Sequence, residues 1–95
     1  MTPLKITFAN AIRKLNFYIR NRPQDYECLK QQLDYHLFGR RNLPKCELEL
    51  YWIDQDSDEI YVLNSDDYIV FQYKCGAEGH LFAVPKAVKN EGKET

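Results

Sequence analysis

Residues 51–68 read YWIDQDSDEIYVLNSDDY, and the fold and the charge distribution of the chain can be worked out from this stretch. Alternating apolar residues flank an acidic centre on both sides: Leu48, Leu50 and Trp52 before it, Ile60 and Val62 after it. Because strand side chains point to opposite faces in turn, the pattern predicts two strands that meet at an acidic tip. On an extended backbone, Asp54, Asp56 and Asp58 would leave the same face.

The net charge of -1 conceals two oppositely charged regions. Between Glu47 and Asp67 there are eight carboxylates and no Lys or Arg, whereas the first 22 residues carry five basic side chains and no acidic one. Like charges this close repel by on the order of 1 kcal/mol per pair in water. We therefore expect the acidic tip to be compensated by a bound cation or by a basic surface, on this chain or on a partner.

A calcium site fits the tip poorly. An EF-hand loop that starts at Asp54 needs Gly at its sixth position and Glu at its twelfth, and these positions hold Glu59 and Ser65. The residues on both sides of the tip also alternate between apolar and polar as in strands, whereas an EF-hand loop is flanked by helices. The three cysteines, Cys28, Cys46 and Cys75, have long and irregular spacing that suits neither a disulfide framework nor a zinc site. The sequence predicts no metal, no cofactor, and thiols in a reducing compartment.

The other elements follow from hydrophobic periodicity. Strands are predicted at residues 4–8, 12–19, 46–53, 60–63 and 80–84. A helix is predicted from about Asp25 to Gly39, with an apolar stripe formed by Tyr26, Leu29, Leu33 and Leu37. A short second helix is predicted after residue 64, with Ser65 as N-cap, Asp66 and Asp67 in the first turn, and Tyr68, Val70, Phe71 and Tyr73 as candidates for burial.

The order of these elements is strand, strand, helix, strand, strand, short helix, strand. Two antiparallel hairpins with a helix between them predict an α+β, ubiquitin-like β-grasp: a mixed sheet of about five strands with one long helix packed on one face. We assign residues 3–85 to this domain and residues 86–95 to the start of a polar linker. No apolar run approaches the roughly 20 residues that cross a bilayer, so we expect a soluble, cytoplasmic chain that does not bind membranes.

The first two strands would concentrate basic charge. A hairpin is expected to place Lys5 near Arg13 and Lys14 across the ladder, with Arg20 as a further exposed cation. These side chains could equally be the solvated charges of an ordinary surface, and the pattern alone leaves both interpretations open.

Two other classes of function are disfavoured. A nucleic-acid module could use Phe17 and Tyr18 for stacking, but the near-neutral net charge and the clustered carboxylates oppose it. An enzyme would need a nucleophile and a base at a recognised spacing, and the candidates show none: Cys28, Cys46, Cys75, His36 and His80.

The residues resemble a known family of interaction domains. Residues 52–60, followed by a strand and then by residues 65–68, are similar to the acidic signature of the PB-one (Phox and Bem-one) domains. Lys5 and the pair Arg13-Lys14 are similar to the basic cluster of a second class of these domains. Carrying both resembles the class that binds head to tail, and the resemblance extends over residues 4–84. It implies that the chain binds copies of itself or other PB-one domains, such as that of atypical protein kinase C.

Three shorter segments narrow the resemblance. Residues 4–8 and 43–46, together with residues 52–54 followed by 58–60, resemble the N-terminal domain of the insect sequestosome-type selective autophagy receptors. This implies a non-enzymatic scaffold for filaments in cytoplasmic protein bodies or autophagosomes. The implied basic face contains Lys5, Arg13, Lys14 and Arg20, and the implied acidic face contains Asp54, Asp56, Asp58, Glu59, Asp66 and Asp67. Ser57 stands where the family often has Gly, which matters if the turn needs a positive φ.

Overall fold

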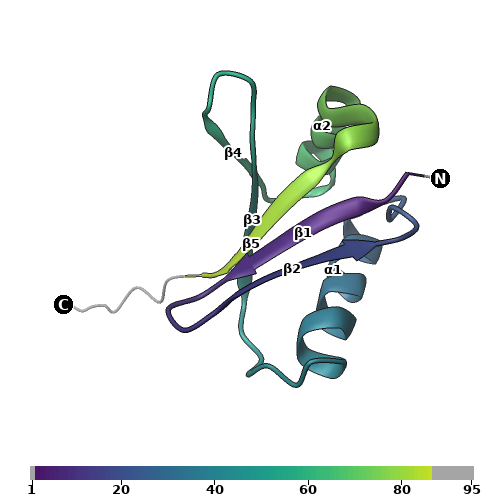
Figure 1. Ribbon diagram of the computed structural model, residues 1–95. Helices are drawn as coiled ribbons and strands as arrows, with labels where there is room; N and C mark the ends of the chain where they lie inside the picture. The colour runs from purple at the N-terminus through teal and green to yellow at the C-terminus, as the bar shows by residue number, and fades with distance from the viewer. Residues whose placement is uncertain (1, 87–95) are drawn as a thin grey trace.

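A computed structural model, which describes residues 2–86, contains one five-stranded mixed sheet (Figure 1). Its strands are β1 (Leu4–Ala9), β2 (Lys14–Ile19), β3 (Leu48–Ile53), β4 (Glu59–Val62) and β5 (His80–Pro85). The spatial order is β2-β1-β5-β3-β4, so the last strand of the chain occupies the centre of the sheet. β5 is parallel to β1, and every other neighbouring pair is antiparallel. The predicted mixed β-grasp sheet is confirmed.

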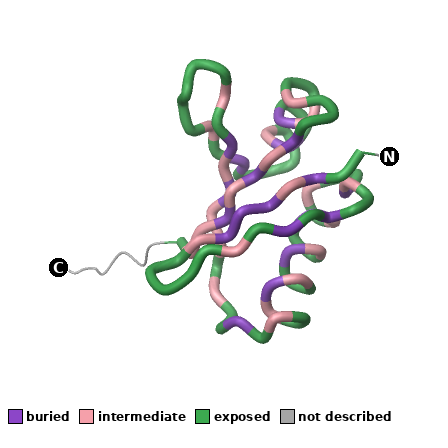
Figure 2. The backbone as a smooth tube through the Cα atoms, in the orientation of Figure 1, coloured by how far each residue is buried: buried purple, intermediate pink, exposed green. Residues whose placement is uncertain are grey.

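Helix α1 (Tyr26–Asp34) continues through a π-helical turn, η1 (Tyr35–Gly39), and crosses one face of the sheet (Figure 1). Asp25 caps its first turn, since its side chain accepts a hydrogen bond from the Cys28 amide at 2.8 Å. The predicted apolar stripe is confirmed, because Leu29, Leu33 and Leu37 are all buried. They meet the apolar face of β1, so the core lies between α1 and the sheet (Figure 2).

Several strand boundaries differ from the prediction, and a side chain that hydrogen-bonds to the main chain explains one of them. The second strand starts at Lys14 and not at residue 12, since the Asn10 side chain accepts hydrogen bonds from the amides of Ile12 and Arg13, both at 2.8 Å. Ile12 and Arg13 therefore belong to the β1–β2 turn. The third strand starts at Leu48, and the fourth strand begins and ends one residue earlier than expected.

Helix α2 (Ser65–Cys75) is capped by Asn64 and not by Ser65. The Asn64 side chain accepts from the Asp67 amide at 3.0 Å. Tyr68 and Phe71 are buried as predicted, and the Phe71 ring meets Trp52 of β3 at a centroid distance of 5.9 Å.

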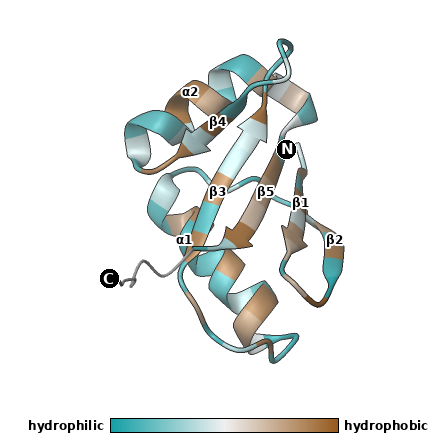
Figure 3. Ribbon diagram, turned by 90° about the vertical axis from the view of Figure 1, so that its left-hand side faces the viewer, coloured by the Kyte–Doolittle hydropathy of each residue, from teal (hydrophilic) through white to brown (hydrophobic). Residues whose placement is uncertain are grey.

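The predicted burial of Val70 and Tyr73 is wrong, since these side chains are 47% and 86% exposed. The helix packs through only one face, which leaves apolar segments of α2 on the outside (Figure 3).

The chain after β5 is only partly covered by the described residues. The Lys86 amide donates to the Glu47 carbonyl at 2.8 Å, and the remainder of the predicted linker, residues 87–95, lies outside the described part. None of the helices between residues 2 and 86 has the length and apolar composition needed to cross a membrane.

Candidate protein-interaction surfaces

The acidic loop, residues 54–58, is a turn and not an extended run. The Asp54 side chain accepts hydrogen bonds from the amides of Asp56 and Asp58, both at 2.9 Å. The main chain closes the same loop, since the Asp54 amide donates to the Asp58 carbonyl at 3.0 Å. The expectation that alternation on a straight strand aligns these carboxylates is therefore wrong. The turn itself brings them together: oxygens of Asp54, Asp56 and Asp58 lie within 4.8 Å of one another.

Ser57 adopts a backbone conformation that is unusual for a residue other than glycine. Its φ is 67°, which is the left-handed conformation that L residues adopt at a cost and glycine adopts freely. The sequence comparison with the family raised this possibility, and the backbone confirms that the position has a positive φ. The loop thus combines a strained backbone residue with converging charges.

The carboxylates of this region divide into two kinds. Asp54 and Asp67 are half-buried and hold main-chain groups, since the Asp67 side chain accepts from the Leu63 amide at 2.9 Å. Asp56, Asp58 and Asp66 are exposed. Side chains of the second kind are free to meet a partner, whereas those of the first kind shape the loop and the start of α2.

Glu59 lies slightly apart from the other carboxylates. It is the first residue of β4, and the Tyr61 hydroxyl donates to its side chain at 3.4 Å. Residues two apart on a strand share a face, so Glu59 and Tyr61 lie on the sheet face away from Trp52 and α2.

The basic residues are arranged differently from the prediction. Lys5 pairs with Tyr18 and Lys14 pairs with Ala9, so the expected pairing of Lys5 with Arg13 and Lys14 is wrong. The register still places Lys5 and Lys14 on the same face, the one opposite α1, at positions about 13 Å apart along the strands. Arg13 stands beside Lys14 in the β1–β2 turn. We call Lys5, Arg13 and Lys14 the basic surface.

Arg20 lies at the Lys5 end of this surface, two positions beyond Tyr18, which pairs with Lys5. It follows the last residue of β2 and is six residues beyond Lys14, which corresponds to about 20 Å of extended strand. It is exposed, but it lies at the other end of the hairpin from the turn.

His80 lies within the basic surface, which the sequence did not indicate. Parallel pairing of β5 with β1 places it beside Lys5, and a 2.7 Å hydrogen bond joins its Nε2 to Thr7 Oγ1. Its ring stacks on Phe82 with a centroid distance of 4.3 Å. Burial, and then the charges of Lys5 and Lys14, lower the pKa of His80. The neutral ring is favoured at this position because the ring is partly buried and because two lysines already supply positive charge.

The β1–β2 turn and the acidic loop lie at opposite corners of the sheet. The turn follows the C-terminal end of β1, and the acidic loop follows the C-terminal end of β3. β1 is parallel to β5, and β3 is antiparallel to β5, so these two ends point in opposite directions (Figure 1). They also approach opposite edge strands, β2 and β4. The turn and the loop of one molecule therefore do not neutralise each other.

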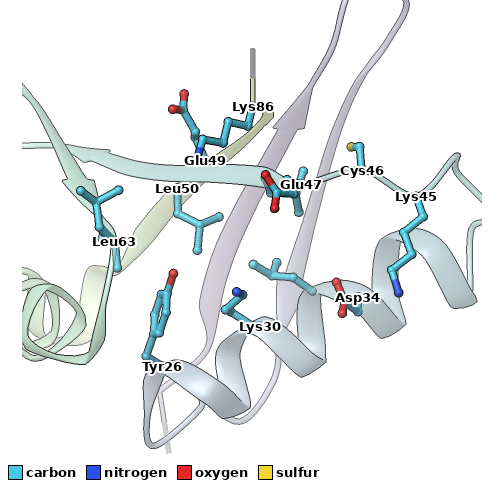
Figure 4. A pocket seen from close by; sticks show the side chains of 13 residues that line it. Tyr26, Lys30, Asp34, Lys45, Cys46, Glu47, Glu49, Leu50, Leu63 and Lys86 are labelled. Atoms are coloured by element: carbon cyan, nitrogen blue, oxygen red, sulfur yellow. The ribbon is translucent and has the colours of Figure 1, made fainter. Parts of the chain in front are cut away.

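A separate hollow of about 350 Å³ lies between α1 and the segment that leads through β3 (Figure 4). Tyr26 and Lys30 of α1 reach toward the strand side of this hollow. Its charged lining residues are balanced in sign: Lys30, Lys45 and Lys86 against Asp34, Glu47 and Glu49. This balance gives the hollow no preference for a ligand of either charge.

Comparisons with known proteins agree with the fold described above. No family model matches the chain. Over 94 residues it is 40% identical to Protein ref(2)P of Drosophila simulans, in an alignment that covers 97% of this chain and 16% of that protein. In fold it is similar to the AtNBR1-PB1 domain, with a TM-score of 0.60 at 12% identity over 90% of this chain and 100% of the other. This chain is a relative of ref(2)P with the PB1 fold.

A second solved structure has the same fold. The cryo-EM structure of an AtNBR1-PB1 filament (L-type) matches 93% of this chain and 100% of its own with a TM-score of 0.55 and 18% identity. The predicted ubiquitin-like β-grasp and the resemblance to the PB-one domains of insect proteins are both confirmed. The chain spans a small part of the length of ref(2)P, so a role for the longer protein remains a matter of proposal.

Proposed function

We propose that this domain associates with copies of itself head to tail. The basic surface of one copy (Lys5, Arg13 and Lys14) docks on the exposed carboxylates of the next, which are Asp56, Asp58 and Asp66. Asp54 and Asp67 hold these groups in place, and Glu59 borders the contact. The observation that supports this most directly is the position of the β1–β2 turn and the acidic loop at opposite corners of one sheet, since each copy then offers two separate charged sites.

Contacts between different patches repeat from copy to copy. They close into rings or continue as filaments, depending on the rotation between neighbours. The likeness to a domain whose solved structure is a filament favours the second outcome. Repetition would give avidity to whatever the longer protein binds. We propose that the domain is the scaffold of a sequestosome-type selective autophagy receptor in cytoplasmic bodies, with no enzymatic, nucleic-acid or membrane-binding role of its own.

Charge pairs alone are too weak for such an assembly. Exposed ion pairs contribute about 0.2 to 1 kcal/mol each, whereas micromolar affinity requires about 8 kcal/mol. The charged groups must therefore act as a cluster that is partly desolvated on docking, with bidentate contacts from Arg13 to carboxylates. Apolar contacts must supply the rest.

A second candidate function is a heterotypic adaptor. Because the β1–β2 turn and the acidic loop are well separated, either charged site could bind a different PB-one domain, such as that of atypical protein kinase C, while the other stays free. Concentration-dependent light scattering of the purified domain separates the two functions. Self-association predicts a mass that grows with concentration and falls with salt, and an adaptor alone predicts a constant monomer.

Complementation provides the direct test. An Arg13→Ala/Lys14→Ala variant loses two of the three cations of the basic surface, and an Asp56→Ala/Asp58→Ala variant loses two of the three exposed carboxylates of the acidic site. Each should be monomeric in size-exclusion chromatography with light scattering, and an equal mixture should form a one-to-one dimer. If the mixture stays monomeric while both variants remain folded, head-to-tail docking is refuted.

A further inference from the structure

A groove of about 500 Å³ runs between the acidic loop and α2. Its lining combines apolar and charged residues: Trp52, Ile53, Ile60, Val70 and Cys75 in the first group, Asp54, Asp56, Glu78 and Lys74 in the second. Three carboxylates against one ammonium give the lining a net negative charge. Asp54 and Asp56 belong both to this groove and to the acidic loop, so the groove is continuous with the proposed docking site.

The β1–β2 turn presents a side chain that fits this groove. Ile12 is 86% exposed and precedes Arg13 and Lys14 directly. The turn is held by three hydrogen bonds. The Asn10 side chain accepts from the Ile12 and Arg13 amides, and the Asn10 main-chain amide donates to the Arg13 carbonyl at 3.0 Å. A large aliphatic side chain is thus held in water at a defined position, and burying it would contribute about 1.5 to 3 kcal/mol.

We propose that Ile12 of one copy inserts into the groove between the acidic loop and α2 of the next copy. The inference rests on the proposed head-to-tail contact and adds its apolar anchor. Charge complementarity favours a second copy as the occupant. Ile12 would enter between the apolar residues of the groove, while the adjacent Arg13 and Lys14 would meet its carboxylates. Buried aliphatic or aromatic anchors surrounded by polar contacts carry most of the energy in many interfaces.

Two features of the receiving copy agree with an apolar anchor. Val70 leaves 47% of its surface exposed at the groove although it lies on a packed helix. Trp52 is 6% exposed, and within residues 2–86 its indole N–H has no hydrogen-bond acceptor. A chain segment entering beside the ring would therefore change the environment of that N–H group directly.

The chain contains a single tryptophan, so this N–H group serves as a specific probe. The Arg13→Ala/Lys14→Ala copy, labelled with ¹⁵N, supplies the groove and is titrated with the Asp56→Ala/Asp58→Ala copy, which supplies the turn. Docking should shift the indole resonance of Trp52. Adding Ile12→Ser to the turn-bearing copy should raise the Kd about tenfold and remove most of that shift.

Matched variants make the test specific. Tyr73→Ser in the turn-bearing copy changes a side chain that is also 86% exposed but lies on α2, and it should alter the Kd by less than about twofold. Val70→Ser in the groove-bearing copy should weaken binding, and combining it with Ile12→Ser should weaken it by less than the product of the two effects.

The outcomes separate the two proposals. If the parent pair binds and Ile12→Ser changes neither the Kd nor the indole shift, the insertion of Ile12 is refuted while head-to-tail docking stands. If the parent pair does not bind at all, head-to-tail docking is refuted and the anchor with it.

Discussion

The β1–β2 turn and the acidic loop are held by the same pattern of hydrogen bonds, but the residue at the centre of the pattern differs in charge. In each, one side chain accepts hydrogen bonds from two main-chain amides: Asn10 in the turn and Asp54 in the loop. In the turn the accepting side chain is the neutral amide of Asn10, whereas in the loop it is the carboxylate of Asp54, which is itself one of the negative charges. Charge and loop shape can therefore be changed separately in the turn, whereas in the acidic loop they are coupled at Asp54.

This difference decides how substitutions should be interpreted. A variant of Arg13 or Lys14 alters charge alone, since both side chains are exposed. A variant of Asp54 or Asp67 alters the main-chain geometry as well as the charge. Loss of binding in the second kind of variant does not by itself identify a contact residue.

The largest expected effect contrasts the two ends of the β1–β2 hairpin. Arg13→Glu/Lys14→Glu should weaken self-association at least about a hundredfold, because like charges would meet the acidic loop of the neighbour. Arg20→Glu should weaken it far less, because Arg20 lies about 20 Å of extended strand from Lys14, at the Lys5 end of the hairpin. Sedimentation velocity at low salt measures both. Equal losses in the two variants would show that the Lys5 end of the hairpin contributes as much as the turn, and would contradict a contact centred on Arg13 and Lys14.

The next effect concerns folding stability. Asp54→Ala should lower the free energy of unfolding by about 1 to 2 kcal/mol, because two amides of the loop lose their acceptor. Asp56→Ala should change it by less than about 0.5 kcal/mol. Urea unfolding in the Arg13→Ala/Lys14→Ala background keeps association out of the measurement. A loss of stability in both variants, or in neither, would remove the distinction between a structural and a free carboxylate.

A smaller and opposite effect is expected at Ser57. Ser57→Gly should raise the free energy of unfolding by about 0.5 to 1 kcal/mol, because glycine relieves the left-handed conformation. Ser65→Gly, in the first turn of α2, should lower it by about 0.5 kcal/mol, because glycine there only adds backbone entropy to the unfolded chain. Thermal unfolding of both variants gives the comparison. If Ser57→Gly were also destabilising, the loop would not be strained at this residue.

The smallest effect is a pH dependence at the basic surface. The folded chain lowers the pKa of His80 below its ordinary value of 6.5, so the unfolded chain takes up the proton first as the pH falls. This contribution to stability is fully present above pH 6.5 and is lost as the pH falls through the lower, folded pKa. Melting temperatures between roughly pH 5 and 8 should therefore fall with acidity in the Asp56→Ala/Asp58→Ala monomer.

His80→Gln should reduce that slope. His36→Gln provides the matched control, because burial, and then Arg41 and Arg40, also lower the pKa of His36, whose ring packs on Phe17 at the other face of the sheet from Lys5 and Lys14. Each substitution should remove its own part of the pH dependence, and the double variant should remove both. An unchanged slope in His80→Gln would show that the ring titrates alike in the folded and unfolded chains.

Local patterns in the sequence were enough to predict most of the elements. The stripe of Leu29, Leu33 and Leu37 predicts the helix, because a period near 3.6 places these side chains on one face. Alternation on both sides of the acidic centre predicts the β3–β4 hairpin. The errors at Val70 and Tyr73 arise because apolar character predicts burial only where a neighbouring element covers that face of the helix.

By itself, the sequence determined the elements, the acidic and basic composition of two turns, and the resemblance to PB-one domains, because all of these depend on residues close together in the chain. Only the tertiary structure decided that β5 enters the middle of the sheet, where it places His80 beside Lys5 and sets the two turns at opposite corners. It also decided that the Asp54 side chain accepts hydrogen bonds from the main chain of the loop, and that a groove whose lining has a net negative charge lies beside it. Strand order and side-chain contacts depend on pairings between residues far apart in the chain, and a local sequence pattern does not reveal the energies of those pairings.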